Sequence, residues 1–387
     1  MYHVKLYNKI SKVGLDDFDA AKYTCAEDFE DYDAVLVRSA KLHDVQFPKS
    51  LKCIARAGAG VNNIPIDRCA AEGIVVFNTP GANANAVKEL VICALLLASR
   101  KVVQGANWVK GLKGTPDIGP AAEKGKATYA GPEIASKRLG IIGLGAIGVK
   151  VANAAVGLDM DVWGYDPYLS VDGALQLSRS VKHVTDIKDI FANCDYITIH
   201  VPLLPTTKHT INAETIAQMK DGVRVINLAR GELVDEQAMA QALASGKVAA
   251  YVSDFASDCI LEQENAITLP HLGASTPESE DNCAKMAVFE IQEYLEKGTI
   301  RNSVNFPNLK VPYEGGYRIC MIHKNTQGMI GSITNVLSAE GANIENMGNR
   351  SKGDYAYTIM DVSVNPTETM LTHLRAIDGM ISVRVIG

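Results

Sequence analysis

The length, composition and charge of the chain exclude several classes of protein. It has 387 residues, of which 47% are hydrophobic and 21% charged, with a net charge of −6 and a pI near 5.8. A single core stops growing near roughly 250 to 300 residues, so we expect two or three packed domains. The acidic balance, with no cluster of Lys and Arg, argues against nucleic acid as a partner.

The N-terminus and the longest apolar run predict a cytoplasmic protein with no membrane contact. The first residues lack the unbroken apolar segment of a signal peptide. The longest apolar run, residues 90–98, is far short of the roughly 20 residues that span a bilayer. The cysteines form no CxxC pair and no histidine lies at a metal-ligand spacing, so we expect reduced cysteines and no metal.

Short β-rich runs alternate with helical or polar stretches at the start of the chain. They predict strands over residues 3–7, 34–38, 51–56 and 74–78. This is the βαβα rhythm of a parallel sheet covered by helices. An apolar helix should follow over 86–99, and the Gly-, Pro- and Lys-rich segment 111–131 should form an arm outside the core.

A second series of strands and helices begins at Arg138. Six strands are expected, over residues 139–143, 161–165, 196–200, 223–227, 249–253 and 266–269. This is the strand count of an α/β fold with a doubly wound Rossmann-type sheet. The amphipathic run 278–297 predicts a long helix, and the polar stretch 298–316 predicts a linker. The remaining residues follow the order βαββαβ, which is the ferredoxin-like plan of an α+β domain.

A dinucleotide-binding pattern stands between the first strand and helix of the second series. Gly143, Gly145 and Gly148 have GxGxxG spacing directly after an apolar strand. Such glycines permit a tight turn, the approach of a pyrophosphate, and close packing of helix on strand. Asp166, at the end of the next strand, would accept hydrogen bonds from the adenosine ribose and repel a 2′-phosphate. The pattern therefore predicts NAD, and the alternative is a glycine-rich turn without a cofactor.

Three ionisable residues, Arg230, Asp258 and His271, come just beyond later strands of this series. α/β enzymes build their sites at this carboxyl edge of the sheet. Taken singly, they could be a surface arginine, a helix N-cap and a core histidine. Together they resemble the D-2-hydroxyacid dehydrogenase family. Its NxARG, FxxE and PHxGxST motifs read here as Asn227–Gly231, Phe255–Asp258 and Pro270–Thr276.

The resemblance covers nearly the whole chain and implies a discontinuous architecture. A flavodoxin-like substrate domain would comprise residues 1–96 and 285–305, and an NAD-binding Rossmann domain, 97–284, would be inserted in it. Substrate would bind between the two. Residues 317–387 resemble an ACT domain, a small-molecule sensor with the ferredoxin-like fold. The family also implies a homodimer or homotetramer.

The resemblance assigns roles to the ionisable residues. Arg230 would hold the substrate carboxylate with paired planar donors that a lysine lacks. His271 would exchange the hydroxyl proton while hydride passes to NAD. The family's glutamate, which orients the imidazole, aligns with Asp258, which is shorter by one methylene, and Glu262 is the alternative. Where the family usually has an aspartate on the carboxamide of NAD, this chain has Ser253, followed by Asp254.

Further contacts are implied by the same resemblance. Those to NAD are Ala146, Ile147, Pro202, Leu228, Ala229, Asp254 and Gly273, besides the glycines, Asp166, Arg230 and His271. The stretches LVRSAKL, ARAGAGVNNI and NTPGANANAVKEL resemble family members that oxidise 3-phosphoglycerate. They imply substrate contacts at Arg38, Ser39, Gly58, Ala59, Gly60, Val61 and Asn83, with Arg38 on the phosphate.

The expected reaction is therefore NAD-dependent oxidation of 3-phosphoglycerate to 3-phosphohydroxypyruvate, the first step of the phosphorylated route to L-serine. The alternatives are a dehydrogenase acting on glyoxylate, hydroxypyruvate or D-lactate, and a noncatalytic NAD-sensing corepressor. In the ACT-like part, His323, Asn325 and Asn343 stand where serine-binding relatives carry effector contacts. The resemblance thus implies L-serine as an effector, and the alternative is a dimerisation module without a ligand.

Overall fold

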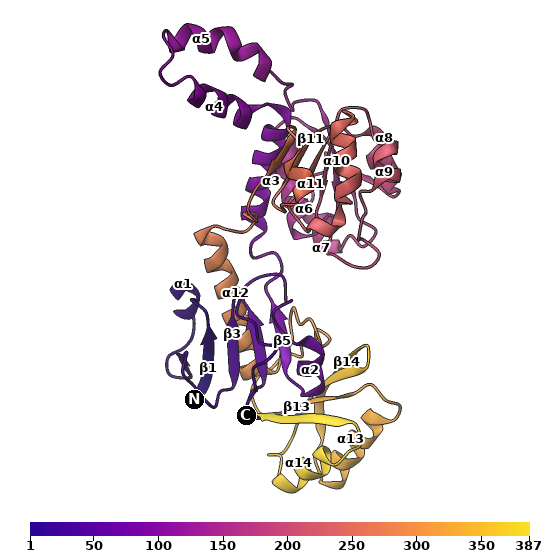
Figure 1. The fold of residues 1–387 in the computed structure, drawn as a ribbon. Helices are drawn as coiled ribbons and strands as arrows, with labels where there is room; N and C mark the ends of the chain where they lie inside the picture. The colour runs from indigo at the N-terminus through magenta and orange to yellow at the C-terminus, as the bar shows by residue number, and fades with distance from the viewer. The chain divides into compact units, whose positions relative to one another are not determined.

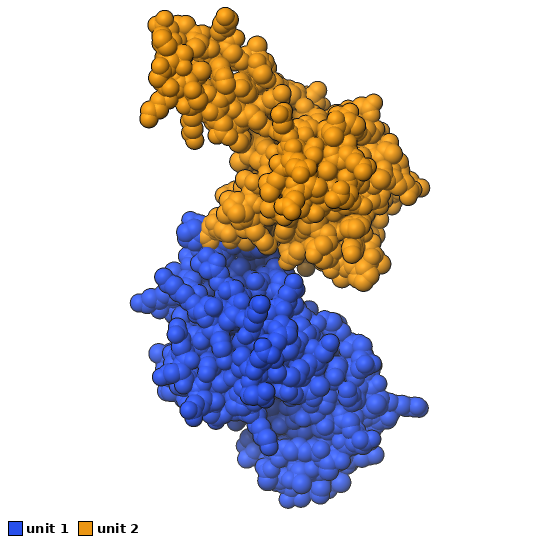
Figure 2. Space-filling model, in the orientation of Figure 1, with its two compact units in different colours: residues 1–83, 277–387 blue, residues 84–276 orange.

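The computed structural model describes residues 1–387, which divide into two compact units (Figure 2). The first unit comprises residues 1–83 and 277–387, and the second, residues 84–276, is inserted in it. The division falls at 83/84 and 276/277 rather than at the expected 96/97 and 284/285. The reason is that α3 (Ala84–Ser99) packs on the sheet of the second unit, whereas α12 (Pro277–Lys297) packs on that of the first.

The first unit contains a five-stranded parallel sheet in the order β2-β1-β3-β4-β5, which is the flavodoxin-like order (Figure 1). Its strands are β1 (Tyr2–Tyr7), β2 (Tyr23–Ala26), β3 (Ala34–Val37), β4 (Cys53–Arg56) and β5 (Val75–Asn78). The sequence predicted four of them. It missed β2 because this four-residue edge strand is only partly buried and carries little hydrophobic signal.

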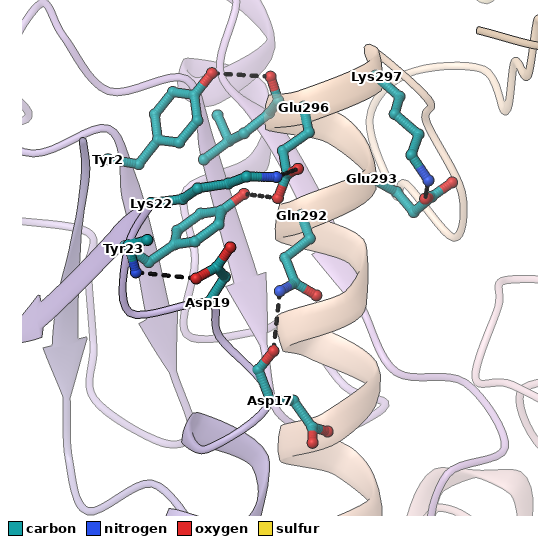
Figure 3. Close-up of polar contacts among 11 residues, drawn as sticks. Tyr2, Asp17, Asp19, Lys22, Tyr23, Gln292, Glu293, Glu296 and Lys297 are labelled. Carbon is teal, nitrogen blue, oxygen red and sulfur yellow. Dashed lines mark hydrogen bonds and ion pairs between the residues drawn. The ribbon is translucent and has the colours of Figure 1, made fainter. Parts of the chain in front are cut away.

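Helices α1 (Lys12–Leu15), α2 (Ile66–Ala71) and α12 complete this part of the fold. The C-terminal turns of α12 are attached to β1 and β2 by polar contacts (Figure 3). The Glu296 carboxylate accepts a hydrogen bond from the Tyr23 hydroxyl at 2.9 Å and pairs with Lys22 at 2.6 Å. At the other end of α12, the Ser11 hydroxyl is hydrogen-bonded to Asp281, so both ends of the helix are fixed on the first unit.

The stretch after α12 was predicted as a polar linker, and this prediction is wrong for much of its length. Ile300, Phe306 and Leu309 are buried in the same core as α12. The Asn305 side chain accepts a hydrogen bond from the Val76 amide at 2.9 Å and donates one to the Ile74 carbonyl at 2.8 Å. The segment therefore covers the free edge of β5, where unpaired backbone groups would otherwise remain.

The second unit is built on a seven-stranded parallel sheet in the order β12-β11-β10-β9-β6-β7-β8. Its strands are β6 (Arg138–Ile142), β7 (Asp161–Tyr165), β8 (Lys182–Val184), β9 (Tyr196–Ile199), β10 (Val223–Asn227), β11 (Val248–Ser253) and β12 (Ala266–Thr268). This order is that of the predicted doubly wound fold, and the sheet has one strand more than the six expected. The additional strand, β8, is a three-residue edge strand with two exposed side chains, so it has no hydrophobic pattern to detect.

Helices cover this sheet on two faces. One buried cluster contains residues of α3 and α6, and another contains residues of α8, α9 and α10. The helices are α3, α6 (Ala146–Val156), α7 (Val171–Gln176), α8 (Ile187–Asn193), α9 (Ala213–Gln218), α10 (Glu236–Ala244) and α11 (Asp258–Leu261). The expected arm is helical: α4 (Val102–Gly111) and α5 (Ile118–Gly125) have no buried residue.

The C-terminal part has the predicted ferredoxin-like plan. An antiparallel sheet in the order β14-β15-β13-β16 packs on two helices. The elements are β13 (Tyr317–Lys324), α13 (Met329–Ala339), β14 (Ile344–Lys352), β15 (Tyr355–Val362), α14 (Glu368–Arg375) and β16 (Met380–Ile386). Nowhere in the chain is a helix long and apolar enough to cross a membrane, and all eight cysteines are free.

This C-terminal part shares a core with the N-terminal sheet and caps α12. The Arg384 guanidinium donates hydrogen bonds to the carbonyl oxygens of Tyr294 at 2.7 Å and Leu295 at 2.9 Å. The fully buried Arg318 donates to the Lys297 carbonyl at 2.8 Å and pairs with Asp361 at 2.6 Å. These cations place positive charge at the C-terminal carbonyls of α12, where the helix dipole favours it.

Candidate active site

Arg230, Asp258 and His271 follow three neighbouring strands of the second unit. Arg230 comes after β10, Asp258 after β11 and His271 after β12, and these strands are adjacent in the sheet. Because the strands are parallel, their carboxyl ends lie on one edge. The structure therefore places the three predicted catalytic residues on the same edge of one sheet.

The backbone around Arg230 is held by short contacts. The Asn227 side chain donates to the Arg230 carbonyl at 2.8 Å, and the Arg230 guanidinium donates one hydrogen bond to the Ala229 carbonyl at 2.6 Å. The side chain is half-buried, and its remaining donors have no partner within the chain. A planar guanidinium with free donors suits a ligand carboxylate.

His271 occupies a constrained backbone position. Its φ of +43° is in the left-handed region, which is uncommon for a residue with a Cβ. Its amide donates to the carbonyls of Asp254 at 3.0 Å and Leu269 at 3.1 Å. The exposed imidazole makes an edge contact with the Phe255 ring, with centroids 5.0 Å apart. The fold thus fixes the imidazole from β11 while leaving its nitrogens open.

Neither candidate for the third catalytic residue contacts His271. Asp258 is in the first turn of α11 and Glu262 is at its C-terminus, and both side chains are exposed. No hydrogen bond joins either carboxylate to the imidazole. The assignment of this role therefore stays a prediction.

The glycine loop fits a dinucleotide. Gly143 has a φ of +97°, and a Cβ there would lie 2.6 Å from the His200 carbonyl oxygen. A Cβ on Gly148 would overlap the Gly143 carbonyl, so helix and strand could not pack. A Cβ on Gly145 would meet nothing within 4 Å, and Gly145 begins α6 without a side-chain cap. The loop therefore leaves open space in front of unpaired helix amides, which is where a pyrophosphate binds.

Asp166 lies beside this loop, at the end of β7. One carboxylate oxygen accepts a hydrogen bond from the Leu144 amide at 2.9 Å and the other accepts from the Tyr168 amide at 2.8 Å. Each oxygen keeps a second lone pair for a hydroxyl donor. The other predicted cofactor residues follow the same strand ends: Ala146 and Ile147 open α6, Pro202 follows β9, and Leu228 and Ala229 follow β10.

Of the two polar residues at the end of β11, Asp254 rather than Ser253 has an oxygen without a partner. Ser253 is fully buried, and its hydroxyl accepts from the Phe255 amide at 3.1 Å. Asp254 is also buried, with one oxygen accepting from the Gly273 amide at 3.0 Å and the other without any partner. A buried carboxylate oxygen without a partner is costly. Asp254 therefore fits a donor group of a ligand such as the carboxamide of NAD.

Sequence reasoning missed His200, which follows β9 next to the glycine loop. Its Nε2 lies 3.0 Å from the Thr198 hydroxyl, and its Nδ1 is buried without a partner. Burial lowers the pKa of His200 to about 4, so the ring is neutral at physiological pH. The available signal was a polar residue directly after an apolar strand, the same signal that pointed to Arg230.

The predicted substrate residues lie at the carboxyl edge of the sheet in the first unit. Arg38 and Ser39 follow β3, the loop of Gly58, Ala59, Gly60 and Val61 follows β4, and Asn83 comes after β5. Asn8, at the end of β1, accepts from the Ser39 amide at 2.9 Å and so orders the Arg38 turn. In the loop after β4, the Asn78 side chain donates to the Ala59 carbonyl at 2.5 Å.

Two charged residues next to Arg38 were not predicted from the sequence. The Arg38 guanidinium forms an ion pair with Glu280 at 2.5 Å. Arg56, the last residue of β4, donates from Nε to the Arg38 carbonyl at 3.0 Å, and its Nη1 lies 2.5 Å from where a Cβ on Gly58 would stand. Arg56 could have been found as a charged residue that ends an apolar strand. Glu280 could not, because it is far from Arg38 in the sequence and no motif connects the two.

The predicted effector residues are not brought together within one chain. His323 is paired with Ala356 at one end of β15, whereas Ile344, next to Asn343, is paired with Val362 at the other end. Strand geometry separates these ends by roughly 20 Å. His323 is also buried, with its ring nitrogens 2.8 Å from the Thr358 hydroxyl and the Lys324 carbonyl. Asn325 and Asn343 are exposed.

Comparison with known proteins shows the family of the chain. Residues 92–273 match the NAD binding domain of the D-isomer specific 2-hydroxyacid dehydrogenases. The chain belongs to the D-isomer specific 2-hydroxyacid dehydrogenase family. It is 34% identical over 340 residues to the D-3-phosphoglycerate dehydrogenase of Haemophilus influenzae, covering 84% of this chain and 79% of that protein. The D-3-phosphoglycerate dehydrogenase of Escherichia coli K12 is 31% identical over 343 residues, with the same coverage.

Solved structures show the same fold. The NAD-bound 3-phosphoglycerate dehydrogenase of Entamoeba histolytica superposes with a TM-score of 0.62 at 26% identity, covering 80% of this chain and 99% of that chain. A glyoxylate reductase from Paecilomyes thermophila gives a TM-score of 0.65 at 25% identity, covering 78% of this chain and 98% of that chain. The protein is thus an NAD-binding dehydrogenase of this family.

Proposed function

We propose that this chain oxidises 3-phosphoglycerate to 3-phosphohydroxypyruvate with NAD as the hydride acceptor. The observation that carries the proposal is the position of Arg230 and His271 after neighbouring strands, at the carboxyl edge of the second unit's sheet, together with the cationic Arg38 at the carboxyl edge of the first unit's own sheet. A substrate with a second anionic group, such as a phosphate, suits the positive charge of the Arg38 guanidinium. The named activity of the relatives from Haemophilus influenzae and Escherichia coli supports the same substrate.

Each group has a role that follows from its chemistry. Arg230 binds the substrate carboxylate through paired donors and draws electron density from the neighbouring carbon. His271 takes the proton from the 2-hydroxyl through its exposed imidazole, whose nitrogens have no hydrogen-bond partner in the chain. Asp258, or Glu262 in its place, stabilises the resulting imidazolium. Arg38, Ser39, Asn83 and the Gly58–Val61 loop hold the phosphate end of the substrate.

The cofactor would be held by the glycine loop, Asp166 and Asp254, and would supply the hydride acceptor. Asp166 faces the ribose hydroxyls and disfavours a 2′-phosphate at close range. The unpartnered oxygen of Asp254 would accept a hydrogen bond from the carboxamide. The buried and neutral His200 adds no positive charge next to the glycine loop.

We further propose that the enzyme is a homo-oligomer, works in the cytoplasm and takes L-serine as an effector. Because His323 and Asn343 lie at opposite ends of β15, one serine molecule would need Asn325 of one chain and Asn343 of a second. Serine would lower activity only by binding the less active arrangement more tightly. Contact with His323 would require breaking one of its internal hydrogen bonds.

Steady-state reduction of NAD tests the proposed reaction. The substrates are 3-phosphoglycerate, glycerate, D-lactate and 2-hydroxyglutarate, and kcat/KM should be highest for 3-phosphoglycerate. The Arg38→Ala variant should lose at least about tenfold, or 1.4 kcal/mol, with 3-phosphoglycerate and much less with glycerate. Equal losses on both substrates would remove Arg38 from the phosphate site, and a preference for D-lactate would point to another dehydrogenase of the family.

A further inference from the structure

The guanidinium that is proposed to bind the substrate phosphate already holds a carboxylate of its own chain. Arg38 and Glu280 form an ion pair at 2.5 Å, and both side chains are 44% exposed. Their Cα atoms belong to the same unit, one after β3 and the other in the first turn of α12. An anionic ligand that binds Arg38 must therefore compete with the Glu280 carboxylate for the N–H donors of the guanidinium.

Contacts of the neighbouring residues hold Glu280 in place at the start of α12. The adjacent Asp281 is hydrogen-bonded to Ser11, which caps α1. Below it, Gly14 of α1 packs so closely on Ala284 that no side chain would fit between them. The first turn of α12 is thus held on α1, and Glu280 is presented to Arg38 by this packing.

The charges around Arg38 determine how Glu280 affects the binding of a phosphate. Arg56 lies against the predicted Gly58–Val61 loop and donates to the Arg38 carbonyl, so two guanidinium groups share this corner. With Glu280 ionised, its carboxylate offsets the positive charge of Arg38. A phosphate dianion must displace the carboxylate from Arg38 and then remain close to it. Both effects weaken the binding of the phosphate.

We infer that Glu280 is a specificity-determining residue that competes with the substrate phosphate for Arg38 and so sets the KM. The inference rests on the proposed function, since it takes Arg38 as the phosphate ligand. A weak anion gains too little from Arg38 to displace Glu280, whereas a doubly charged phosphate gains enough. The carboxylate therefore keeps the site closed to weaker anions, at the cost of a higher KM for the substrate.

Glu280→Gln in the full chain is the direct test. It removes the charge but keeps the shape, so KM for 3-phosphoglycerate should fall by about three- to fivefold, which corresponds to about 0.6 to 1 kcal/mol, the upper part of the range for exposed ion pairs. The KM for glycerate, which has no phosphate, and kcat should stay within about twofold. Inorganic phosphate should inhibit the variant at a correspondingly lower concentration.

Glu278→Gln is the matched control, because Glu278 is in the same first turn of α12 but has no ion pair with Arg38. It should leave all these constants unchanged. If Glu280→Gln leaves KM for 3-phosphoglycerate unchanged or raises it while Arg38→Ala loses activity selectively on that substrate, the inference is wrong and the proposed function stands. If Arg38→Ala affects phosphorylated and unphosphorylated substrates equally, both are overturned.

Discussion

The buried Asp254 carboxylate accepts a hydrogen bond from the Gly273 amide at 3.0 Å. It thereby connects the end of β11 to the loop that carries His271, and its other oxygen has no partner. In Asp254→Asn, the amide oxygen can keep the bond to Gly273, but an NH₂ group then stands where the free oxygen was. Since that group cannot accept a hydrogen bond, we expect NAD to bind at least about tenfold more weakly. A fluorescence titration with NAD measures this, and unchanged affinity would contradict the role given to Asp254.

Asp166 should determine the choice between NAD and NADP. Asp166→Ala removes the carboxylate that would repel a 2′-phosphate. The ratio of kcat/KM for NAD to kcat/KM for NADP should therefore fall. The ratio is the right measure, because loss of the hydrogen bonds from Leu144 and Tyr168 would affect both cofactors alike. Equal use of the two cofactors by the unaltered enzyme would refute the assignment.

The identity of the third catalytic residue can be determined by comparing two variants in which a carboxylate is replaced by its neutral amide. If Asp258 stabilises the imidazolium of His271, Asp258→Asn should lose at least about tenfold in kcat, or 1.4 kcal/mol, and shift the pH profile. Glu262→Gln, four residues further along and equally exposed, then serves as the control and should be near normal. The opposite pattern would transfer the role to Glu262.

Glu290 should make the stability of the protein depend on pH. It is buried in α12, with one oxygen accepting from Asn302 at 2.7 Å and the other without a partner, and burial raises its pKa to about 8. Between its ordinary pKa of 4.5 and 8, the folded state keeps a proton that the unfolded state releases. The free energy of unfolding therefore falls as pH rises, by about 1.4 kcal/mol per pH unit.

Glu290→Gln removes this dependence while keeping an oxygen for Asn302. Its gain in Tm over the unaltered protein should be larger at pH 8 than at pH 5.5, by about 3 °C or more. The exposed Glu278→Gln, on the same helix, should show no such change between the two pH values. A gain that is the same at both would mean that Glu290 is ionised throughout.

Regulation by serine can be tested with the chain intact. Millimolar L-serine should lower the initial rate, and Asn325→Ala should raise the concentration needed for half inhibition by about tenfold or more. Asn346→Ala changes an exposed asparagine on β14 and should leave inhibition unaltered. Absence of inhibition in the unaltered protein would leave the C-terminal part as an assembly module.

Features that depend on short stretches of sequence could be predicted. The glycine loop could be located because strand, glycines and helix follow one another directly, and Arg230 and His271 because each follows an apolar strand. The same reasoning failed for β2 and β8, which are short edge strands with exposed side chains. It also failed for Ile300 and Phe306, whose polar surroundings suggested a linker although both are buried.

Contacts between residues that are far apart in the chain could not be predicted from the sequence. Arg38 and Glu280 are brought together only because α12 returns to the first sheet after the whole second unit has been inserted. One oxygen of Asp254 lacks a partner because of the residues that surround it in the fold, and no sequence motif indicates this. The absence of a contact between His271 and Asp258 is likewise a matter of side-chain placement rather than of residue type.

The capping of α12 by Arg384 has a consequence for cutting the chain. The exposed residues around Glu314 form the covalent connection to the C-terminal part, and a protease would find its easiest target there. A single cut would not release that part, because Arg384 still binds the end of α12 and Tyr357 still donates to the Gly298 carbonyl at 2.7 Å. The two fragments should co-elute on a sizing column and separate only in denaturant. A gene fusion or deletion made at this point would expose apolar surface on both sides instead of yielding two independent proteins.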